Sequence, residues 1–378
     1  MTYKIPGMRT SRIKRKIESI REKSKVSWLF FIPLMLSIIG LFFIFEASSI
    51  RSYMDVGDSF HYLKLQAVRI VLGVIVLLFF SMLDYHKLYY LSFIFMITTI
   101  MLLVFVLIPN IGRQAGGAQR WIDLGLFERQ PTEVAKFATI IYLSSWFNHR
   151  ERKRFFSFFI LLSILMFLIM LQPDMGTAII IFSLSIIIYF LAGIELHYLL
   201  YLIPVSVGGF FILVKTSPYR FRRIMAFFNP ALDPLGITYH INQILISLTH
   251  GGILGRGFGA SRQKYLFLPE AHTDSIFAII GEEVGFVGSI ILIATFILFL
   301  YYLYRVSVHA SDRFGRLLSG GIFAFFGLQI IINLSAMVNL MPLTGVPLPF
   351  FSYGGSHILT SFMLIGIVIN IAKQSKTY

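Results

Sequence analysis

Four side chains that can carry charge or move a proton lie in one short segment of the chain. The stretch KYLFLPEAHTD places Lys264, Glu270, His272 and Asp274 directly before an apolar run that begins at Ile276. A carboxylate at the mouth of a membrane helix is costly to keep there, which makes Asp274 a candidate functional group. Together with Glu270 it has the composition of a carboxylate pair for acid–base catalysis.

The composition defines the class of protein that must position these groups. Of 378 residues, 57% are hydrophobic and only 13% are charged, which leaves too little polar surface for a soluble globule. Cysteine is absent, which excludes disulfides and thiolate metal sites. The net charge of +15 favours an anionic partner such as membrane lipid. The basic residues are scattered between apolar runs rather than gathered on one face, which disfavours nucleic acid.

Ten apolar runs are long enough to be counted as membrane spans, since a bilayer core of about 30 Å needs about 20 mainly apolar residues per helix. We therefore expect an all-α, polytopic membrane fold with about ten transmembrane helices. Lys136 interrupts the fourth and shortest run. The expected spans are 28–45, 67–83, 88–108, 132–147, 155–171, 177–194, 198–214, 275–304, 317–338 and 358–371.

The distribution of lysine and arginine predicts the orientation. Residues 1–26 read as a basic cytoplasmic arm, since no short apolar core with a cleavage site follows the charges. Residues 27–378 form a single transmembrane domain. With the N-terminus inside, most lysines and arginines fall in inner segments, as the positive-inside rule requires. Both termini are then cytoplasmic, and 215–273 is a long extracytoplasmic loop between the seventh and eighth spans, with Asp274 also outside.

The long loop carries a second group of basic residues. Between residues 220 and 223 three arginines accompany apolar residues at helical spacing, which predicts a short basic helix lying in the membrane interface. The glycine-rich stretch 251–259 is not a nucleotide-binding loop, because no strand precedes it. It is either an anion-binding nest or a flexible connector, with Arg262 and Lys264 close behind. The loop favours an anionic ligand, although solvated arginines would look the same.

Polar residues elsewhere have structural explanations beside functional ones. A glycine-bounded loop carries Arg120 and Trp121. Glu133 and Lys136 are three residues apart, so they share a helix face and could form a structural ion pair. Asp174 stands where a helix begins, and capping alone explains it.

The helix that follows Asp274 suggests where this carboxylate points. At 100° per residue, Gly281 and Gly285 lie on the side of Asp274, whereas Glu283 points away from it. Asp274 should therefore lie above a close-packed small-residue stripe and face the bundle interior. Glu282 either faces a polar cavity or pairs with a basic group within the bundle.

The motifs, taken together, resemble those of one family. The blocks GAQRWI, QPTE, QPDMGTA, SRQKY, LPEAHTD, GEEVG and PLTGVPLPFFSYGG occur in order between about Trp28 and the end of the chain. They resemble the SEDS proteins (shape, elongation, division and sporulation), which include FtsW and RodA. The EAHTD block and the stretch LKLQ are more similar to the division-type FtsW branch, with RodA as the alternative. Ser275 departs from the family pattern, which commonly has an aromatic residue there.

The resemblance implies peptidoglycan glycosyltransferase activity, in which lipid II is polymerised outside the cytoplasmic membrane. It implies that Asp274 is catalytic. It also implies a class B penicillin-binding protein as partner, together with divisome or elongasome proteins. A divalent cation, Mg²⁺ or Mn²⁺, is implied by the family alone, and the sequence identifies no ligands for it.

The residues are compatible with this chemistry. A lipid diphosphate is a good leaving group, so a single carboxylate suffices where glycosidases need two. Asp274 would then be the general base on the 4-hydroxyl of the acceptor, with inversion at the donor carbon. Glu270 and His272 would orient it. The residues expected to contact substrate are Arg120, Trp121, Lys136, Arg262, Lys264, Glu270 and His272.

Two other functions remain open at this stage. A lipid II flippase would need a polar path through the membrane, and intramembrane Lys136, Glu282 and Glu283 could belong to one. Such a transporter should place essential polar groups toward both faces. A scaffold for cell-wall partners would explain the basic arm but not the charged outer loop.

Overall fold

The computed structural model describes residues 8–109, 112–115, 118–123, 128–149, 155–194, 196–202, 218–230 and 233–375, with a few isolated positions between 204 and 215. Six described helices are long and apolar enough to cross a membrane. They are α1 (Met8–Val56), α2 (His61–Met82), α3 (His86–Phe105), α10 (Ile276–His309), α11 (Arg313–Met337) and α12 (Gly355–Gln374). The polytopic membrane fold is thus confirmed.

The remaining spans are shorter or lie outside the described residues. The helices α4 (Pro131–Trp146), α5 (Phe155–Leu171) and α6 (Met175–Leu191) have 16 or 17 residues each. Of the expected seventh span, 198–214, the structure describes little beyond the 3-10 helix η1 (Leu196–Tyr201). The count of ten therefore stays a prediction.

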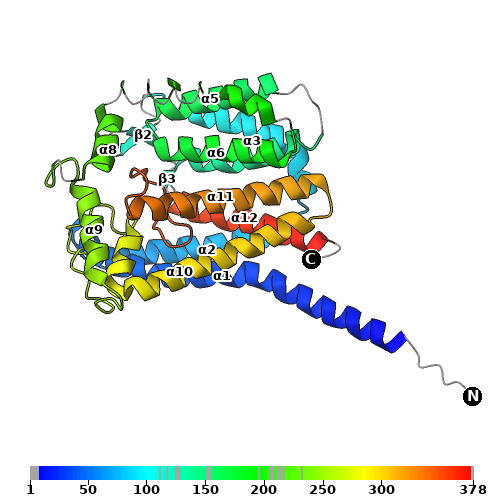
Figure 1. The fold of residues 1–378 in the computed structure, drawn as a ribbon, viewed down its shortest axis with the longest axis horizontal. Coiled ribbons are helices and arrows are strands. Elements are labelled where there is room, and N and C mark those ends of the chain that lie inside the picture. The colour runs from blue at the N-terminus through cyan, green and yellow to red at the C-terminus, as the bar shows by residue number, and fades with distance from the viewer. Residues whose placement is uncertain are drawn as a thin grey trace, which may run out of the picture.

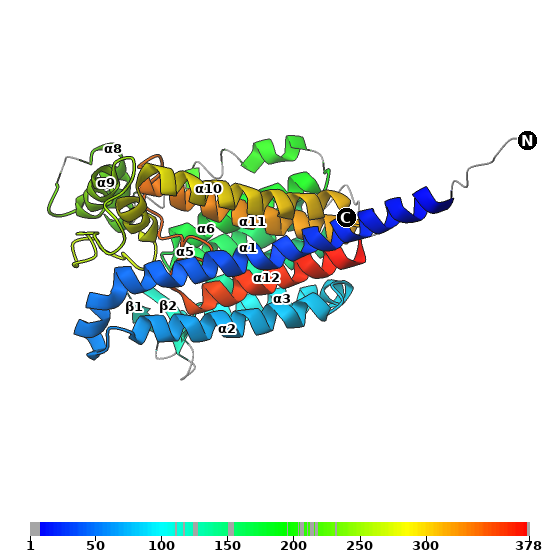
Figure 2. The same cartoon turned by 90° about the horizontal axis from the view of Figure 1, so that it is seen from below.

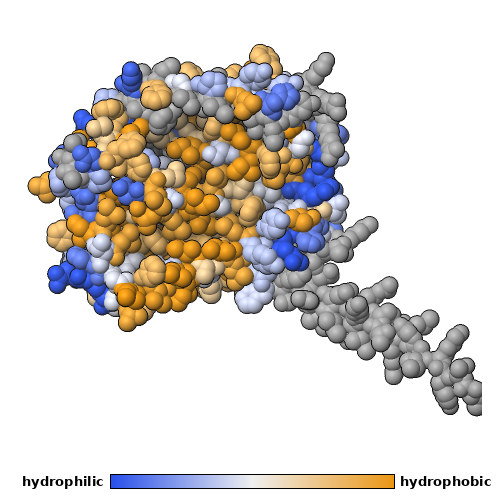
Figure 3. Space-filling model, viewed as in Figure 1, coloured by the Kyte–Doolittle hydropathy of each residue, from blue (hydrophilic) through white to orange (hydrophobic). Residues whose placement is uncertain are grey.

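The helices run roughly parallel to one long axis, with α11 and α12 near the centre (Figures 1 and 2). Helix α12 packs mainly on α2, α11 on α10 and α6, and α3 on α4. In their most apolar stretches, 78% of the α12 residues are buried but only 17% of those of α10, which places α10 at the periphery. A broad apolar band lies between more polar ends (Figure 3), as expected of a surface that faces lipid.

Two short helices gather at one end of the bundle, α8 (Pro218–Phe228) and α9 (Tyr239–Gly251) (Figures 1 and 2). We call this end, at which α10 begins and α1 ends, the site end. The other end carries the α2–α3 and α10–α11 turns and is called the opposite end. The predicted short basic helix is confirmed as α8, although its arginines differ in burial. Arg220 is buried and donates to the carbonyl of Met170 at 2.9 Å, whereas Arg222 is exposed.

A small antiparallel sheet accompanies the helices. It consists of β1 (Gly112–Ala115), β2 (Ala118–Asp123) and β3 (Glu128–Arg129), in the order β1-β2-β3. The sequence between β1 and β2 is Gly-Gly, a strong hairpin signal. The sheet is small and lies outside the apolar spans, so the predicted all-α class of the membrane fold is confirmed.

Helix α10 is broken near its start, which corrects the expected helical wheel. Gly285 has φ 68° and ψ −166°, and a regular wheel cannot be continued across it. The amide groups of Phe286 and Val287 donate instead to the carbonyls of Gly252 and Ile253, at 2.9 and 3.1 Å. Close packing at this point is confirmed, since a Cβ on Gly285 would lie 2.2 Å from the nitrogen of Gly255.

The same exchange of hydrogen bonds defines the glycine-rich stretch 251–259. The amides of Arg256 and Gly257 donate to the carbonyls of Glu282 and Glu283, each at 3.0 Å. These donors are therefore used within the protein, and the interpretation of this part of the stretch as an anion nest was wrong. The segment is a strap that is hydrogen-bonded to the break in α10.

Candidate functional site

Asp274 lies at the site end, immediately before α10, and lines a small hollow. The cavity measures about 90 Å³, and Asp274 is half-buried in it. The carboxylate faces the bundle rather than lipid, as predicted. The other lining residues are Arg223, His240, Glu270, Ser275, Asn333, Ala336, Met337, Leu343, Thr344, Gly345 and Val346.

Two distant segments approach Asp274, one at its backbone and one at its carboxylate. The amide group of Asn333, buried on α11, donates to the carbonyl of Asp274 at 2.9 Å and to that of Val346 at 2.8 Å. Gly345 has φ 73°, and a Cβ placed on it would be 3.1 Å from Oδ2 of Asp274. The glycine thus lets the segment before α12 approach the carboxylate closely. Neither residue was identified from the sequence.

Glu270 shapes the turn on which Asp274 is carried. Its backbone has φ 50°, an unusual value for a residue with a side chain. Its carbonyl accepts from the amides of Thr273 and Ser275 at 3.2 and 3.1 Å, and its carboxylate accepts from the hydroxyl of Thr273 at 2.8 Å. These contacts agree with the orienting role expected of Glu270, and its contact with substrate stays a prediction.

Arg223 and His240 connect the hollow to a larger cavity of about 450 Å³, which both residues also line together with Arg222 and Asp233. Arg223 donates to the carbonyl of Leu343 at 2.7 Å. The hollow therefore brings a guanidinium and a carboxylate together beside a second, adjacent cavity. That arrangement could hold an anionic group next to a base.

His240 is a neutral polar group at this junction. Burial lowers the pKa of His240 to about 4, and the nearby charge of Arg223 also lowers it. Its Nε2 lies 2.8 Å from the hydroxyl of Ser275. Ser275, where the family pattern commonly has an aromatic residue, thus contributes a hydrogen-bonding partner. No spacing in the sequence pointed to His240, whereas the arginine cluster could have drawn attention to Arg223.

A match to a family model covers nearly all of the chain. Residues 27–377 match the cell cycle protein family of FtsW, RodA and SpoVE. The chain belongs to this family. Stage V sporulation protein E of Bacillus subtilis is 35% identical over 354 residues, which cover 92% of this chain and 97% of that protein. A probable peptidoglycan glycosyltransferase FtsW of Geobacter metallireducens is 35% identical over 347 residues, covering 90% and 92%.

Solved structures share the fold. One is a chain of a peptidoglycan synthase complex that coordinates polymerization and crosslinking, with 25% identity and a TM-score of 0.76, covering 93% of this chain and 98% of that one. Another is RodA of Thermus thermophilus, with 24% identity, a TM-score of 0.68 and coverage of 93% and 97%. The FtsW/RodA/SpoVE fold therefore extends over almost the whole chain.

In this FtsW/RodA/SpoVE protein Lys264 is held within the fold. Its Nζ lies 2.7 Å from the carboxylate of Glu46 and 2.7 Å from the carbonyl of Gly259, with Glu283 at 3.9 Å. The contacts tie the strap to α1 and to α10. They favour a structural role, and a contact of Lys264 with substrate stays a prediction.

Glu282 organises the segment that contains Arg262. Fully buried, its carboxylate accepts from the hydroxyl of Ser261 at 2.6 Å and from the amides of Arg262 and Gln263 at 3.3 and 3.4 Å. The expected basic partner is only partly present, as the half-exposed His250 at 3.8 Å. The side chain of Arg262 is exposed, so its role in binding stays open to test.

His272 belongs to an aromatic cluster rather than to the hollow. Its ring stacks on Tyr62 with the centroids 5.2 Å apart, and Tyr353 lies at 5.5 Å. Burial lowers the pKa of His272 to about 4, so the ring is neutral at pH 7. These contacts fasten the segment before Asp274 to α2 and to the start of α12. Substrate binding by His272 stays a prediction.

The remaining predicted residues lie on other elements. Lys136 and Glu133 form a buried ion pair of 2.6 Å on α4, which confirms their shared face. Trp121 is half-buried on β2, opposite Arg113 in register. The side chain of Arg120, also on β2, lies outside what the structure describes. The capping role of Asp174 is confirmed by its 3.1 Å bond from the amide of Thr177.

A metal site can be assessed only for the described residues. Among them, no group of three or more His, Asp or Glu side chains could hold a metal ion. Asp274 and Glu270 nevertheless line the same hollow. Mg²⁺ is commonly bound by one or two carboxylates together with substrate phosphates, and these two carboxylates would fit that arrangement.

Proposed function

We propose that this protein is a peptidoglycan glycosyltransferase that polymerises lipid II at the outer face of the cytoplasmic membrane, with both termini inside. The observation that carries the proposal is the half-buried carboxylate of Asp274 in a hollow that shares Arg223 with an adjacent cavity lined by arginines. The names of the relatives support the reaction. They also favour septal synthesis of the FtsW type over the RodA type.

Asp274 is the general base of this reaction. It takes the proton from the 4-hydroxyl of the acceptor sugar, and that oxygen forms a bond to the anomeric carbon of the donor. The bond from this carbon to the diphosphate breaks, and its electron pair leaves with the diphosphate, so the configuration inverts. A second carboxylic acid is not needed, because the diphosphate departs without protonation.

Arg223 stabilises the negative charge that develops on the departing diphosphate. A fixed guanidinium suits this task, since it presents paired donors to phosphate oxygens in a planar fork. Its bond to the carbonyl of Leu343 holds it beside the hollow before substrate arrives. His240 is neutral at pH 7, so it adds no positive charge beside the diphosphate. A divalent cation shared by Asp274, Glu270 and the phosphates would add to this stabilisation.

The protein works with a class B penicillin-binding protein that crosslinks the new glycan, and with divisome proteins. Support comes from the likeness to a chain of a synthase complex that coordinates polymerization and crosslinking.

The test is polymerisation of lipid II by the purified protein with its penicillin-binding partner, whose crosslinking site is inactivated and whose own polymerising capacity is excluded. The Asp274→Ala and Asp274→Asn variants should form glycan at least about 10²-fold more slowly than the parent. Glycan formation by either variant at the rate of the parent would remove Asp274 as the base. Translocation of lipid II in vesicles without polymerisation would instead support a transporter.

A further inference from the structure

Arg69 is a charged residue inside a membrane-spanning helix that the reaction described above does not use. It lies on α2, about two turns from the start of the helix at His61, and is partly buried. Its guanidinium carbon is 4.7 Å from the centre of the Tyr353 ring. A charge at such a depth is costly unless it meets a counter-charge or a polar cavity, and it therefore marks a functional position.

No acidic side chain compensates this charge among the residues that the structure describes. The guanidinium contacts the Tyr353 ring and lies close to Gly355, where an added Cβ would be 2.9 Å from Nε of Arg69. One terminal nitrogen, Nη1, is buried without a hydrogen-bond partner. A cation–π contact recovers about 0.5–2 kcal/mol, less than the removal of a guanidinium from water costs.

A second unused donor lies next to Arg69. Gln66 precedes it by three residues on α2, so the two side chains share a helix face. The carbonyl oxygen of the Gln66 side chain accepts from the amide of Gly354 at 3.3 Å. The side-chain amide nitrogen of Gln66 therefore points away from Gly354. That nitrogen is buried and has no partner. A charged and a neutral donor therefore face the same turn before α12, and both lack an acceptor.

Contacts of Tyr353 link this pair of donors to the segment that carries Asp274. The Tyr353 ring contacts both Arg69 and His272, which is two residues before Asp274. The amide of Tyr353 also donates to the carbonyl of His272 at 2.9 Å. The apolar face of α2 beside Arg69 is open to lipid, with Leu65, Val68 and Val71 between 38% and 60% exposed.

We infer that Arg69 and Gln66 bind the phosphate group of an anionic lipid, and that this lipid is the polyprenyl diphosphate carrier of the sugar. The inference rests on the proposed function for its choice of lipid. Phosphate oxygens supply the missing counter-charge and accept from both unused donors. The exposed apolar face of α2 receives the hydrocarbon chain. The diphosphate then reaches the site from the membrane, beside Tyr353.

The experiment measures binding without turnover. The purified full chain, in nanodiscs of phosphatidylcholine, is titrated with undecaprenyl diphosphate that carries no sugar. Arg69→Gln should weaken binding about tenfold or more, as expected for the loss of a charge-assisted hydrogen bond. Lys64→Gln is the matched control, since Lys64 is an exposed residue of the same helix that pairs with Asp58 at 2.8 Å. Its affinity should stay within about twofold of the parent.

Two further measurements separate the explanations. Without ligand, Arg69→Gln should unfold at the same temperature as the parent or a higher one, because it removes an uncompensated charge; a purely structural arginine would lower it. Should the neutral variant fail to fold, Arg69→Lys keeps the charge but not the planar fork, and should bind about three- to tenfold more weakly than the parent.

Undiminished binding by Arg69→Gln would overturn the inference. Equal binding of phosphatidylglycerol, with the same dependence on Arg69, would overturn the choice of the polyprenyl carrier and assign the site to bulk lipid. Arg69-dependent binding of undecaprenyl diphosphate by a parent protein that forms no glycan would support this inference while refuting the proposed function.

Discussion

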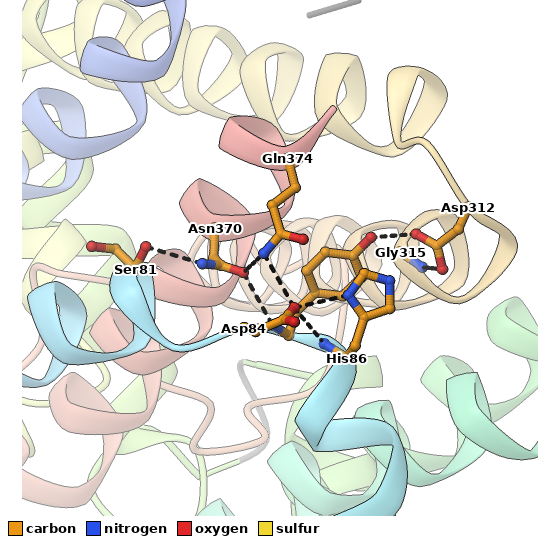
Figure 4. Close-up of polar contacts among 8 residues, drawn as sticks. Ser81, Asp84, His86, Asp312, Gly315, Asn370 and Gln374 are labelled. Atoms are coloured by element: carbon orange, nitrogen blue, oxygen red, sulfur yellow. Dashed lines mark hydrogen bonds and ion pairs between the residues drawn. The ribbon is translucent and has the colours of Figure 1, made fainter. Parts of the chain in front are cut away.

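The two ends of the bundle differ in what their polar side chains contact. At the site end, Asp274, Arg223 and His240 line adjacent cavities. At the opposite end, polar side chains from the α2–α3 turn, the α10–α11 turn and α12 bond to one another (Figure 4). One end keeps space next to charge, and the other uses its polar groups to join helices.

The network at the opposite end is centred on Asn370. Its carbonyl oxygen accepts from the amide of Tyr85 at 3.1 Å, and its amide nitrogen donates to the carbonyl of Ser81 at 3.1 Å. Gln374 donates to both Asn370 and Asp84, at 2.9 and 3.2 Å. Asp84 also contacts His86, whose hydrogen bond is the main cause that lowers the pKa of Asp84 (Figure 4).

A second part of the network ties α11 to its neighbours. Asp312 caps α11 through the amide of Gly315 and accepts from the hydroxyl of Tyr85. Arg313 donates to the carbonyls of Ala192 and Phe147, at 2.7 and 3.2 Å. A transporter would have to break such contacts to open this end, whereas a polymerase that works at one face gains rigidity from them. The asymmetry favours the enzyme.

The strongest test of this difference between the two ends is to neutralise one aspartate at each end. Asp274→Asn should lower the rate of lipid II polymerisation by about 10² to 10⁴, the usual contribution of a general base. Asp312→Asn keeps the shape of the side chain but leaves one accepting oxygen for the two donors Gly315 and Tyr85. It should leave the rate within about threefold and cost about 1 kcal/mol of stability. Glycan chains separated on gels measure the rates. Equal losses of activity would show that the two ends are not functionally distinct.

The next test compares Arg223 at the site end with Arg313 at the opposite end, both of which donate to backbone carbonyls. Arg223→Gln should reduce kcat/KM by about 10- to 100-fold, because it removes charge beside the departing diphosphate. Arg313→Gln should lower the free energy of unfolding by about 1–3 kcal/mol and leave kcat/KM of the folded protein nearly unchanged. Thermal unfolding in detergent and initial rates distinguish these effects. A loss of activity confined to Arg313→Gln would reverse the assignment.

Two buried asparagines should behave alike in stability and differently in activity. Asn333→Ala and Asn370→Ala each strand buried backbone groups, and each should cost about 1–3 kcal/mol of stability. Only Asn333 holds the backbone of Asp274, so only its replacement should lower kcat with little change in KM. If Asn370→Ala lowered kcat equally at a temperature where both variants are folded, the ends would be coupled.

The smallest expected effect concerns pH. The pKa of His272 is about 4 in the folded protein, below its ordinary 6.5, so the unfolded chain takes up the proton first. Stability due to this residue is present above pH 6.5 and is lost as pH falls toward 4. The pKa of Asp84 is lowered from 3.8, so its contribution is lost only below that.

The change that tests this pH dependence is His272→Phe, which keeps an aromatic ring against Tyr62 and cannot titrate. The melting temperature should decline less steeply between pH 6.5 and 4 in this variant than in the parent. His240 retains part of the slope, because burial lowers its pKa to the same value. His86→Phe, at the opposite end, serves as the comparison. An unchanged slope in His272→Phe would show that its ring is not the group that resists protonation.

Several features were predictable because they depend on neighbours in sequence. Apolar runs of membrane length identify the helices, the three-residue spacing places Lys136 against Glu133, and Asp174 caps the helix that it precedes. The position of Asp274 before an apolar run also sufficed to select it. The Gly-Gly dipeptide between β1 and β2 is likewise a local signal for a hairpin.

Tertiary structure alone decided what surrounds Asp274. Arg223, His240 and Asn333 come from three separate helices, and no spacing in the sequence relates them. Lys264 became part of an internal ion pair because Glu46, more than two hundred residues away, lies beside it. The break at Gly285 depends on carbonyls from another segment. Local periodicity determines which residues can be buried in the membrane, whereas long-range packing determines which polar groups meet and which are left for a ligand.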